Sequence, residues 1–381
     1  MVIGFDASRV FVGKRTGTEN YSYQLLKSLS KIDKKNSYKV YIRFINDPIG
    51  ELMKILPKNS EIVEIKWNRL WTQGGLAIQT FIDSLDVLFI PSHTLPIIRK
   101  PGLKTVMTVH DLGVEYLPYY HQLKQQLYLK YITRYQLQTA TKLIAVSNAT
   151  KEDLLKKASI HPQKVSVVYE GFDNNLFRPV KSDILVTSLR QYKLIPGEYF
   201  LSVGTVQPRK NLERLIKAFY HSQKKIASGF SNPRNDIHLV IAGSKGWLAD
   251  EIYRLPKELG IEDKVKFLGY VPDKDLPALY SGAIALTFPS LFEGFGLPIL
   301  EAQACGCPVV TSNISSMPEV AGKGAIYVNP YSVDDIVKGM GKCQISNVKS
   351  QIVKAGFENV KRFSWEKTAK ETLKILEEAA K

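Results

Sequence analysis

The chain has 381 residues, of which 44% are hydrophobic, 10% aromatic and 23% charged, and its mean hydropathy is −0.12. This composition excludes a disordered, collagen-like or low-complexity protein, and the length suffices for two domains. The 52 Lys and Arg against 36 Asp and Glu give a net charge of +16, which favours an anionic partner. No apolar run reaches the roughly 18 residues of a membrane span, and no export leader is evident. Three cysteines suggest no disulfide framework. We therefore expect a cytoplasmic protein.

In the first half of the chain, short apolar runs alternate with longer helical patterns. We expect strands at residues 2–6, 38–44, 61–65, 87–91, 105–110, 142–146 and 165–169, and helices at 19–30, 76–83, 120–139 and 149–158. Such alternation is typical of repeated βα units around a parallel sheet. Residues 171–198 are rich in turn-forming residues, and we expect the linker between two domains there.

A second βα series follows this linker. We expect its strands at residues 199–203, 238–242, 265–268, 283–288, 308–311 and 325–328, and its helices at 211–227, 248–259, 273–280, 298–304 and 332–342. The fold class is therefore α/β, with two doubly wound domains. Ligands of such sheets bind beyond the carboxyl ends of the strands, so we expect the site in the cleft between the domains.

Residues 288–302 combine a strand, a loop with two glycines and a helix with Pro298 in its first turn. Backbone amides at the start of a helix favour anions and hydroxyls. We expect the amides of four residues to contact a ligand here: Gly294, Phe295, Gly296 and Leu297. Glu293 lies in the loop, and Glu301 follows eight residues later, roughly two helical turns, so both carboxylates can face one long ligand. An arbitrary pair of glutamates is more often solvated or paired locally.

This segment resembles the E-x7-E motif of the retaining GT-B glycosyltransferases of the group 1 or family 4 type. The likeness runs from Glu293 to Glu301 and continues through residues 302–320. It implies a GT-B fold, with two Rossmann-like domains facing a central cleft. It also implies that Glu293 contacts the donor sugar and that Glu301 accepts hydrogen bonds from the ribose hydroxyls.

A second matching segment, residues 202–212, brings Arg209 and Lys210 to the start of a helix. Two cations beside helix-start amides favour a diphosphate, and the resemblance assigns them the diphosphate leaving group of the donor. The alternative is that both are solvated surface cations.

Other strand ends supply further candidates. Residues 10–20 contain Gly13 and Gly17, which form neither a GxGxxG fingerprint nor a Walker loop. This stretch resembles the family's loop over the donor phosphates, which points to Gly17 more than to Gly13; an ordinary strand-to-helix turn is the alternative. The resemblance also places His110, at a strand end, against the donor sugar, and Gly243 and Val271 in the loops around the base.

Two acidic residues, Asp273 and Asp275, form a DxD triplet of the kind that binds a metal in another glycosyltransferase fold. Helix capping explains them more simply here. Cys305 and Cys307 have neither CxxC spacing nor a neighbouring histidine for a zinc site. We therefore expect no metal, and no cofactor besides the nucleotide sugar as donor substrate.

With this resemblance, these features predict a hexosyltransferase that moves a mannose- or glucose-type sugar from a nucleotide-diphosphate sugar to an acceptor hydroxyl, in glycan, polysaccharide or glycolipid synthesis. The resemblance implies that transfer proceeds with retention. We expect residues 1–180 to hold the acceptor and residues 181–362 to bind the nucleotide sugar, while the resemblance implies that the helix at 363–381 returns to the first domain. The expected catalytic residues are Glu293, His110, Lys210 and Arg209. The alternatives are a nucleotide-sugar epimerase or phosphorylase of the same fold, or a non-catalytic protein that binds an anionic ligand. No nucleic-acid-binding motif is present, so nucleic acid is not expected as a partner.

The positive charge is concentrated in residues 1–190, where 27 Lys and Arg against 16 Asp and Glu give +11. Residues 119–142 mix Lys124, Lys130, Arg134 and Lys142 with tyrosines and leucines. This pattern is typical of a helix on an anionic membrane surface, or of a helix whose apolar residues face the sheet and whose basic rim is solvated. We expect peripheral association with the inner face of the membrane and a glycan or lipid-linked acceptor; a phosphorylated acceptor is the alternative.

Overall fold

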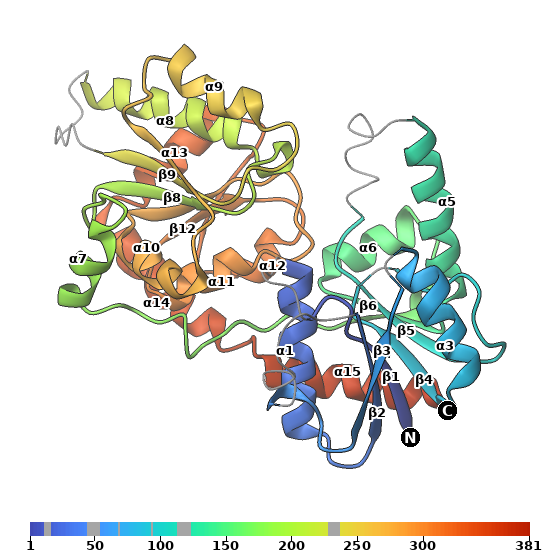
Figure 1. The fold of residues 1–381 in the computed structure, drawn as a ribbon. Coiled ribbons are helices and arrows are strands. Elements are labelled where there is room, and N and C mark those ends of the chain that lie inside the picture. The colour runs from blue at the N-terminus through green and yellow to red at the C-terminus, as the bar shows by residue number, and fades with distance from the viewer. Residues whose placement is uncertain (11–16, 44–53, 68, 93, 113–122, 228–236) are drawn as a thin grey trace. The chain divides into compact units, whose positions relative to one another are not determined.

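The computed structural model describes residues 1–10, 17–43, 54–67, 69–92, 94–112, 123–227 and 237–381, with backbone alone at 123–130 and 224–227. These residues form two compact units: unit 1 comprises Met1–Gly171 and Phe363–Lys381, and unit 2 comprises Phe172–Arg362. Each unit has one parallel sheet with helices packed on it (Figure 1). Residues 172–180, which the sequence analysis assigned to the first domain, pack with unit 2.

Unit 1 contains a seven-stranded parallel sheet with the order β3-β2-β1-β4-β5-β6-β7. Its strands are β1 Val2–Asp6, β2 Ser37–Arg43, β3 Ser60–Ile65, β4 Val87–Ile90, β5 Lys104–Val109, β6 Lys142–Ala145 and β7 Val165–Val167. Its helices are α1 Gly17–Ile32, the π-helix η1 Trp71–Leu76, α3 Ala77–Ile82, α5 Leu123–Thr139, α6 Asn148–Lys156, the 3-10 turn η3 Pro162–Lys164 and α15 Trp365–Ala380.

The core of unit 1 accounts for the continuously apolar sequence of its central strand, β4. All four residues of β4 are buried, as expected for a parallel strand covered on both faces. Helix α15 begins where the Ser364 side chain accepts a hydrogen bond from the Lys367 amide. It then packs on α1, with the rings of Tyr21 and Trp365 5.8 Å apart, so the C-terminal helix completes the core of unit 1.

Unit 2 contains a six-stranded parallel sheet with the order β10-β9-β8-β11-β12-β13. Its strands are β8 Tyr199–Val203, β9 His238–Ala242, β10 Val265–Gly269, β11 Ala285–Phe288, β12 Val309–Ser312 and β13 Ile326–Val328. Its helices are α7 Ser182–Arg190, η4 Pro208–Lys210, α8 Leu212–Ala227, α9 Asp250–Glu258, η5 Asp273–Asp275, α10 Leu276–Gly282, α11 Leu297–Ala304, α12 Met317–Ala321, α13 Val333–Lys342 and α14 Ser346–Val360. Both sheets are parallel and doubly wound, which confirms the predicted fold class.

Three helices of unit 2, α7, α12 and α14, were not expected from the sequence. Residues 171–198 were predicted to be a linker, but they contain α7, which packs on α10: a Cβ on Gly282 would lie 2.6 Å from the Leu189 side chain. Turn-forming residues on both sides of α7 concealed its short apolar pattern. Helix α14 buries few residues, Ile352, Gly356 and Asn359 among them, so its sequence carries little helical periodicity.

Candidate functional site

The strand order of unit 2 reverses between β8 and β11, and doubly wound sheets bind ligands at the carboxyl ends of the strands that flank such a reversal. The segment after β8 carries Arg209 and Lys210 in the 3-10 turn η4. The segment after β11 carries Glu293. Two motifs that lie far apart in the sequence therefore meet at the ligand-binding edge of unit 2.

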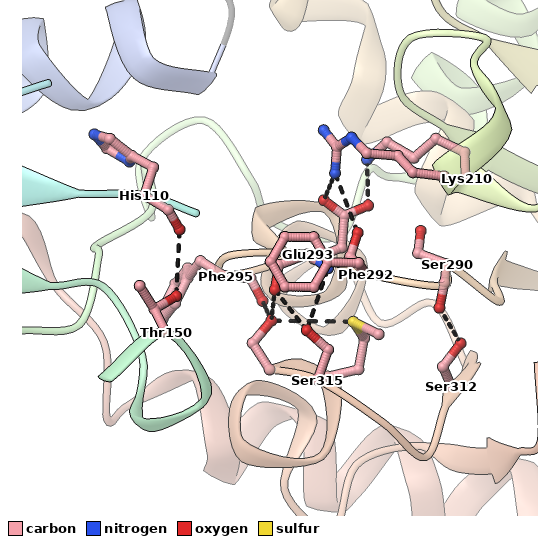
Figure 2. A network of polar contacts seen from close by, with 12 residues as sticks. His110, Thr150, Lys210, Ser290, Phe292, Glu293, Phe295, Ser312 and Ser315 are labelled. Atoms are coloured by element: carbon pink, nitrogen blue, oxygen red, sulfur yellow. Dashed lines mark hydrogen bonds and ion pairs between the residues drawn. The ribbon is translucent and has the colours of Figure 1, made fainter. Parts of the chain in front are cut away.

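Glu293 lies between the two cations. Its Oε2 is 2.5 Å from Nη1 of Arg209, and its Oε1 is 2.6 Å from Nζ of Lys210 (Figure 2). Only 6% of Glu293 is exposed. Burial alone would raise the pKa of this carboxyl, but the charges of Arg209 and Lys210 outweigh burial and lower the pKa to about 2. The site thus holds a buried, ionised carboxylate between a guanidinium and an ammonium group.

Backbone hydrogen bonds join the two segments. The Leu291 amide donates to the Arg209 carbonyl at 2.9 Å. Asn211 adopts a left-handed conformation with φ of 60°, and its side-chain amide donates to the carbonyls of Pro289 and Pro330 at 2.9 and 2.7 Å. These bonds fix the spacing of the cations relative to the loop of Glu293.

Two serine hydroxyls hold the Glu293 loop from the opposite side. Ser315 and Ser316 each donate to the Glu293 carbonyl, at 2.8 and 2.9 Å, and Ser316 also reaches the Phe295 carbonyl at 2.7 Å (Figure 2). The turn that carries both serines follows β12. The loop is therefore anchored independently of its charged side chain.

Lys210 has a specific place in the packing of unit 2. Gly204 follows β8 and has a φ of 137°, and a Cβ at this position would lie 3.0 Å from Cε of Lys210. The ammonium group lies 4.7 Å from the ring centroid of Phe288 on β11, within cation–π range. Lys210 is directed toward Glu293 by two neighbours: Gly204, which follows β8 and has no side chain, and the ring of Phe288 on β11.

The second glutamate of the motif has a different environment. Helix α11 begins at Leu297 after Gly296, whose φ is 111°, so Glu301 lies on the helix whereas Glu293 lies in the preceding loop. The phenol of Tyr280, which is fully buried on α10, donates to Glu301 Oε2 at 2.7 Å. Burial raises the pKa of Glu301 to about 7, although the Tyr280 hydrogen bond acts in the opposite direction.

The remaining donor-side candidates lie at the ends of β9 and β10. Gly243 follows β9, and a Cβ there would lie 2.0 Å from the Gly204 carbonyl oxygen, so only glycine fits this approach of two strand ends. Val271 follows β10 and is 6% exposed. The predicted capping role of Asp275 is wrong, because its carboxylate accepts a hydrogen bond from the Tyr192 hydroxyl at 2.9 Å and makes no side-chain cap on α10. Within the described ranges, no group of three or more His, Cys, Asp or Glu is placed to hold a metal ion.

In unit 1, His110 follows β5. Its Nδ1 lies 3.2 Å from Glu170 Oε1, its Nε2 lies 2.9 Å from the Pro91 carbonyl, and Tyr21 packs edge-on against the ring at 4.7 Å. Acceptors at both ring nitrogens match the doubly protonated imidazolium. Burial alone would lower the pKa of His110, but the hydrogen bond and charge of Glu170 outweigh burial and raise it. The structure shows His110 engaged within unit 1, and its contact with a donor sugar remains a prediction.

Two other predicted features of unit 1 are described in part. Gly17 is the first residue of α1, whereas Gly13 lies outside the described residues, as do residues 119–122. In α5, Tyr131 and Tyr135 are 70% and 45% exposed and Arg134 is also exposed, so these side chains do not face the sheet. No helix within the described part of the chain is long and apolar enough to cross a membrane.

Comparison with known proteins places the chain in a family. The model for "Glycosyl transferases group 1" matches residues 190–351, and that for "Glycosyltransferase Family 4" matches residues 16–176. The O-antigen chain mannosyltransferase RfbU of Salmonella typhimurium is 30% identical over 91% of this chain and 94% of its own length. The chain belongs to the group 1 glycosyltransferases. A further relative of this glycosyltransferase, O-antigen chain mannosyltransferase B of Escherichia coli, is 30% identical over 71% of this chain and 69% of its own.

Solved structures show the same fold as this glycosyltransferase. Sucrose-phosphate synthase from Thermosynechococcus elongatus superposes with a TM-score of 0.75 at 17% identity, covering 99% of this chain and 98% of its own. WaaG, a glycosyltransferase involved in lipopolysaccharide biosynthesis, gives 0.70 at 17% identity, covering 98% and 99%. These likenesses confirm the GT-B fold.

Sequence reasoning missed three groups that position the predicted residues of this glycosyltransferase: Tyr280 beside Glu301, Glu170 beside His110, and the Ser315–Ser316 pair. Tyr280 and Ser316 carry no local signal. Glu170 follows a strand in an otherwise apolar stretch, and a carboxylate at such a strand end could have been noted.

Proposed function

We propose that this glycosyltransferase moves a mannose- or glucose-type hexose from a nucleotide-diphosphate sugar to an acceptor hydroxyl, with retention of anomeric configuration. The observation that carries the proposal is the placement of Arg209, Lys210 and Glu293 at the carboxyl ends of β8 and β11. Two cations there provide the charge that a diphosphate requires. GDP-mannose is our first choice of donor, followed by UDP-hexoses, because the relatives include O-antigen mannosyltransferases.

The donor diphosphate would take over the partners of Glu293. With a dianion bound, Arg209 and Lys210 have a stronger electrostatic partner than one carboxylate. Glu293 would then be available to accept hydrogen bonds from the sugar hydroxyls. Both cations would stabilise the charge that grows on the leaving group, and preorganised donors of this kind contribute about 3 kcal/mol each.

Retention is proposed through attack on the same face as the departing phosphate. A covalent route would need a carboxylate placed to attack the anomeric carbon, whereas we propose that Glu293 accepts hydrogen bonds from the sugar hydroxyls. The departing phosphate would instead accept the proton of the acceptor hydroxyl. Glu301 would bind the ribose hydroxyls through its carboxylate.

We also propose that transfer needs no divalent cation, since Arg209 and Lys210 supply the positive charge that Mg²⁺ supplies in other phosphate sites. Full activity in EDTA is the expected outcome. Loss of transfer in EDTA, with recovery on adding Mg²⁺ or Mn²⁺, would instead require carboxylate ligands such as Asp273 and Asp275.

The acceptor is proposed to be a glycan or lipid-linked sugar at the inner face of the cytoplasmic membrane. The +11 charge of residues 1–190 and the exposed Tyr131, Arg134 and Tyr135 of α5 support a cationic surface with amphipathic side chains. The O-antigen relatives suggest a polysaccharide product.

The test is a panel of nucleotide sugars assayed by thermal shift, hydrolysis and transfer, because a bound donor raises the melting temperature by mass action. We expect one nucleotide class to stabilise the protein, and Lys210→Ala to lose both this shift and turnover. Interconversion of the donor sugar without an acceptor would favour an epimerase, and a requirement for inorganic phosphate a phosphorylase. An unchanged rate in Lys210→Ala would remove this lysine from the site.

A further inference from the structure

The exposed large hydrophobic side chains of unit 1 are confined to one region. Among the residues of unit 1 that the structure describes, all of them lie in two stretches, residues 67–98 and 131–135. They are Trp67, Leu70, Ile78, Phe81, Ile82, Ile98, Tyr131 and Tyr135, with exposed fractions between 45% and 71%. We call these eight residues the apolar face of unit 1.

Hydrogen bonds connect these two stretches. The Lys100 amide donates to the Thr80 hydroxyl at 3.1 Å, which fixes the segment after Ile98 against α3. On the other side of this segment, Arg99 donates to the Thr139 carbonyl at the end of α5 at 2.8 Å. Helix α3 and the C-terminal end of α5 accordingly lie on one side of unit 1 (Figure 1).

Helix α3 presents its apolar residues outward as well as inward. Ala77 and Thr80 are buried against the unit, whereas Ile78, Phe81 and Ile82 are 48%, 50% and 67% exposed. Spacings of three and four residues put the exposed three on one face. A helix that is solvated on its outer face normally carries polar residues there, so this face has the composition of a surface that becomes covered.

The charges within the segments of the apolar face are positive. Exposed Arg69, Lys100 and Arg134 lie in these segments, and residues 66–82, 95–104 and 123–142 contain no Asp or Glu, although the exposed Glu64 of β3 precedes Trp67 by three residues. The nearest acids after α3 are engaged elsewhere: Asp83 is buried and paired with Lys39 at 2.7 Å, and Asp86 accepts from the Val2 amide at 2.6 Å.

We propose that the apolar face of unit 1 docks on an anionic lipid surface, inserting the α3 side chains while the three cations meet the headgroups. Trp67, Tyr131 and Tyr135 match the interfacial region of a bilayer, where amphipathic aromatic rings are favoured. This inference rests on the proposed membrane-proximal acceptor and names the surface that reaches it. The contact extends beyond the basic helix indicated by the sequence, because six of the eight residues of the apolar face lie within residues 67–98, outside that helix.

The experiment is co-sedimentation with vesicles of phosphatidylglycerol mixed with phosphatidylcholine, and with vesicles of phosphatidylcholine alone. Wild type should bind the anionic vesicles and release in high salt. The double variant Phe81→Ser/Ile82→Ser should bind at least about tenfold more weakly, since each methylene withdrawn from a membrane lowers partitioning about fourfold. Lys100→Glu should weaken binding at least about fivefold, the contribution of one basic residue near an anionic surface.

A matched control removes exposed apolar residues elsewhere. Ile184 and Val186 of α7 in unit 2 are 55% and 42% exposed, and Ile184→Ser/Val186→Ser should bind vesicles as wild type does. The nucleotide-dependent thermal shift should be the same in all variants, because all the changed residues lie on exposed surfaces.

Three results would overturn the proposal. The first is equal binding of wild type to anionic and neutral vesicles, and the second is undiminished binding of Phe81→Ser/Ile82→Ser to anionic vesicles. The third is a concentration-dependent dimer of wild type that Phe81→Ser/Ile82→Ser abolishes, because such a dimer would assign the face to a second copy of the chain. The thermal shift separates this inference from the proposed function. A protein that binds vesicles but no nucleotide sugar would retain the docking surface and lose the donor assignment.

Discussion

Replacement of Glu293 by glutamine should destabilise the free protein and strengthen its binding of a nucleoside diphosphate. The substitution keeps the size of the side chain and removes its charge, so Arg209 and Lys210 lose the carboxylate that they share at 2.5 and 2.6 Å. The pKa of Glu293 falls from 4.5 to about 2 on folding, so the ionised form is favoured over a neutral one by about 3 kcal/mol. This contribution is fully present above pH 4.5 and is lost as the pH falls toward 2, so it is complete at pH 7.

Urea unfolding at pH 7 measures the loss, and a fall of about 3 kcal/mol corresponds to roughly 6 to 12 °C in melting temperature for a unit of this size. Addition of GDP or UDP, which carry no sugar, should stabilise Glu293→Gln more than wild type, because the diphosphate no longer displaces a carboxylate. Turnover with the complete donor should fall.

Glu262 offers a matched control, because it is exposed and lies in the same unit. Glu262→Gln should change the free energy of unfolding by less than about 0.5 kcal/mol. The reasoning would be refuted if Glu293→Gln were as stable as wild type at pH 7, or if a nucleoside diphosphate stabilised it less than wild type.

Three further predictions concern groups that position site residues. Nucleotide-sugar affinity, measured by calorimetry, should be about tenfold higher at pH 8 than at pH 6, because Glu301 has a pKa of about 7 and binds ribose hydroxyls as the carboxylate; Tyr280→Phe should move this transition to higher pH. Glu170→Gln should lower the pKa of His110, which NMR of the imidazole can follow. The loss in free energy of unfolding caused by this substitution should be largest below pH 6.5 and should shrink as the pH rises. Gly243→Ala should lower the melting temperature by several degrees, because its Cβ would lie 2.0 Å from a backbone oxygen.

Controls make each of these predictions specific. Glu301→Gln should abolish the pH dependence of affinity, and a dependence that survives this change would belong to another group. An unshifted His110 titration in Glu170→Gln would contradict the ion pair. Gly341→Ala, near the end of α13 and with no described atom within 4 Å of the new Cβ, should leave stability unchanged or slightly raised, in contrast to Gly243→Ala.

The sequence by itself determined the alternation of strands and helices and the strand ends that carry the charged motifs. Local periodicity is sufficient for this, because a parallel sheet covered on both faces needs apolar runs such as residues 87–90. Since all parallel strands point the same way, motifs that follow two strands of one sheet lie at the same edge, so the sequence alone put Arg209 and Glu293 at one edge of the second sheet.

Only the tertiary structure decided which side chains pair. The contacts of Glu293 with Lys210 and of His110 with Glu170 join residues 83 and 60 positions apart, and that of Tyr280 with Glu301 depends on how two helices pack. Their surroundings then set their ionisation, because the same residue type has a pKa of about 2 beside two cations at Glu293 and about 7 in a partly buried position without a paired cation at Glu301. Packing likewise decided which face of α3 is exposed. The sequence pattern shows that Ile78, Phe81 and Ile82 share one side of the helix, but only the neighbouring elements determine whether that side is covered.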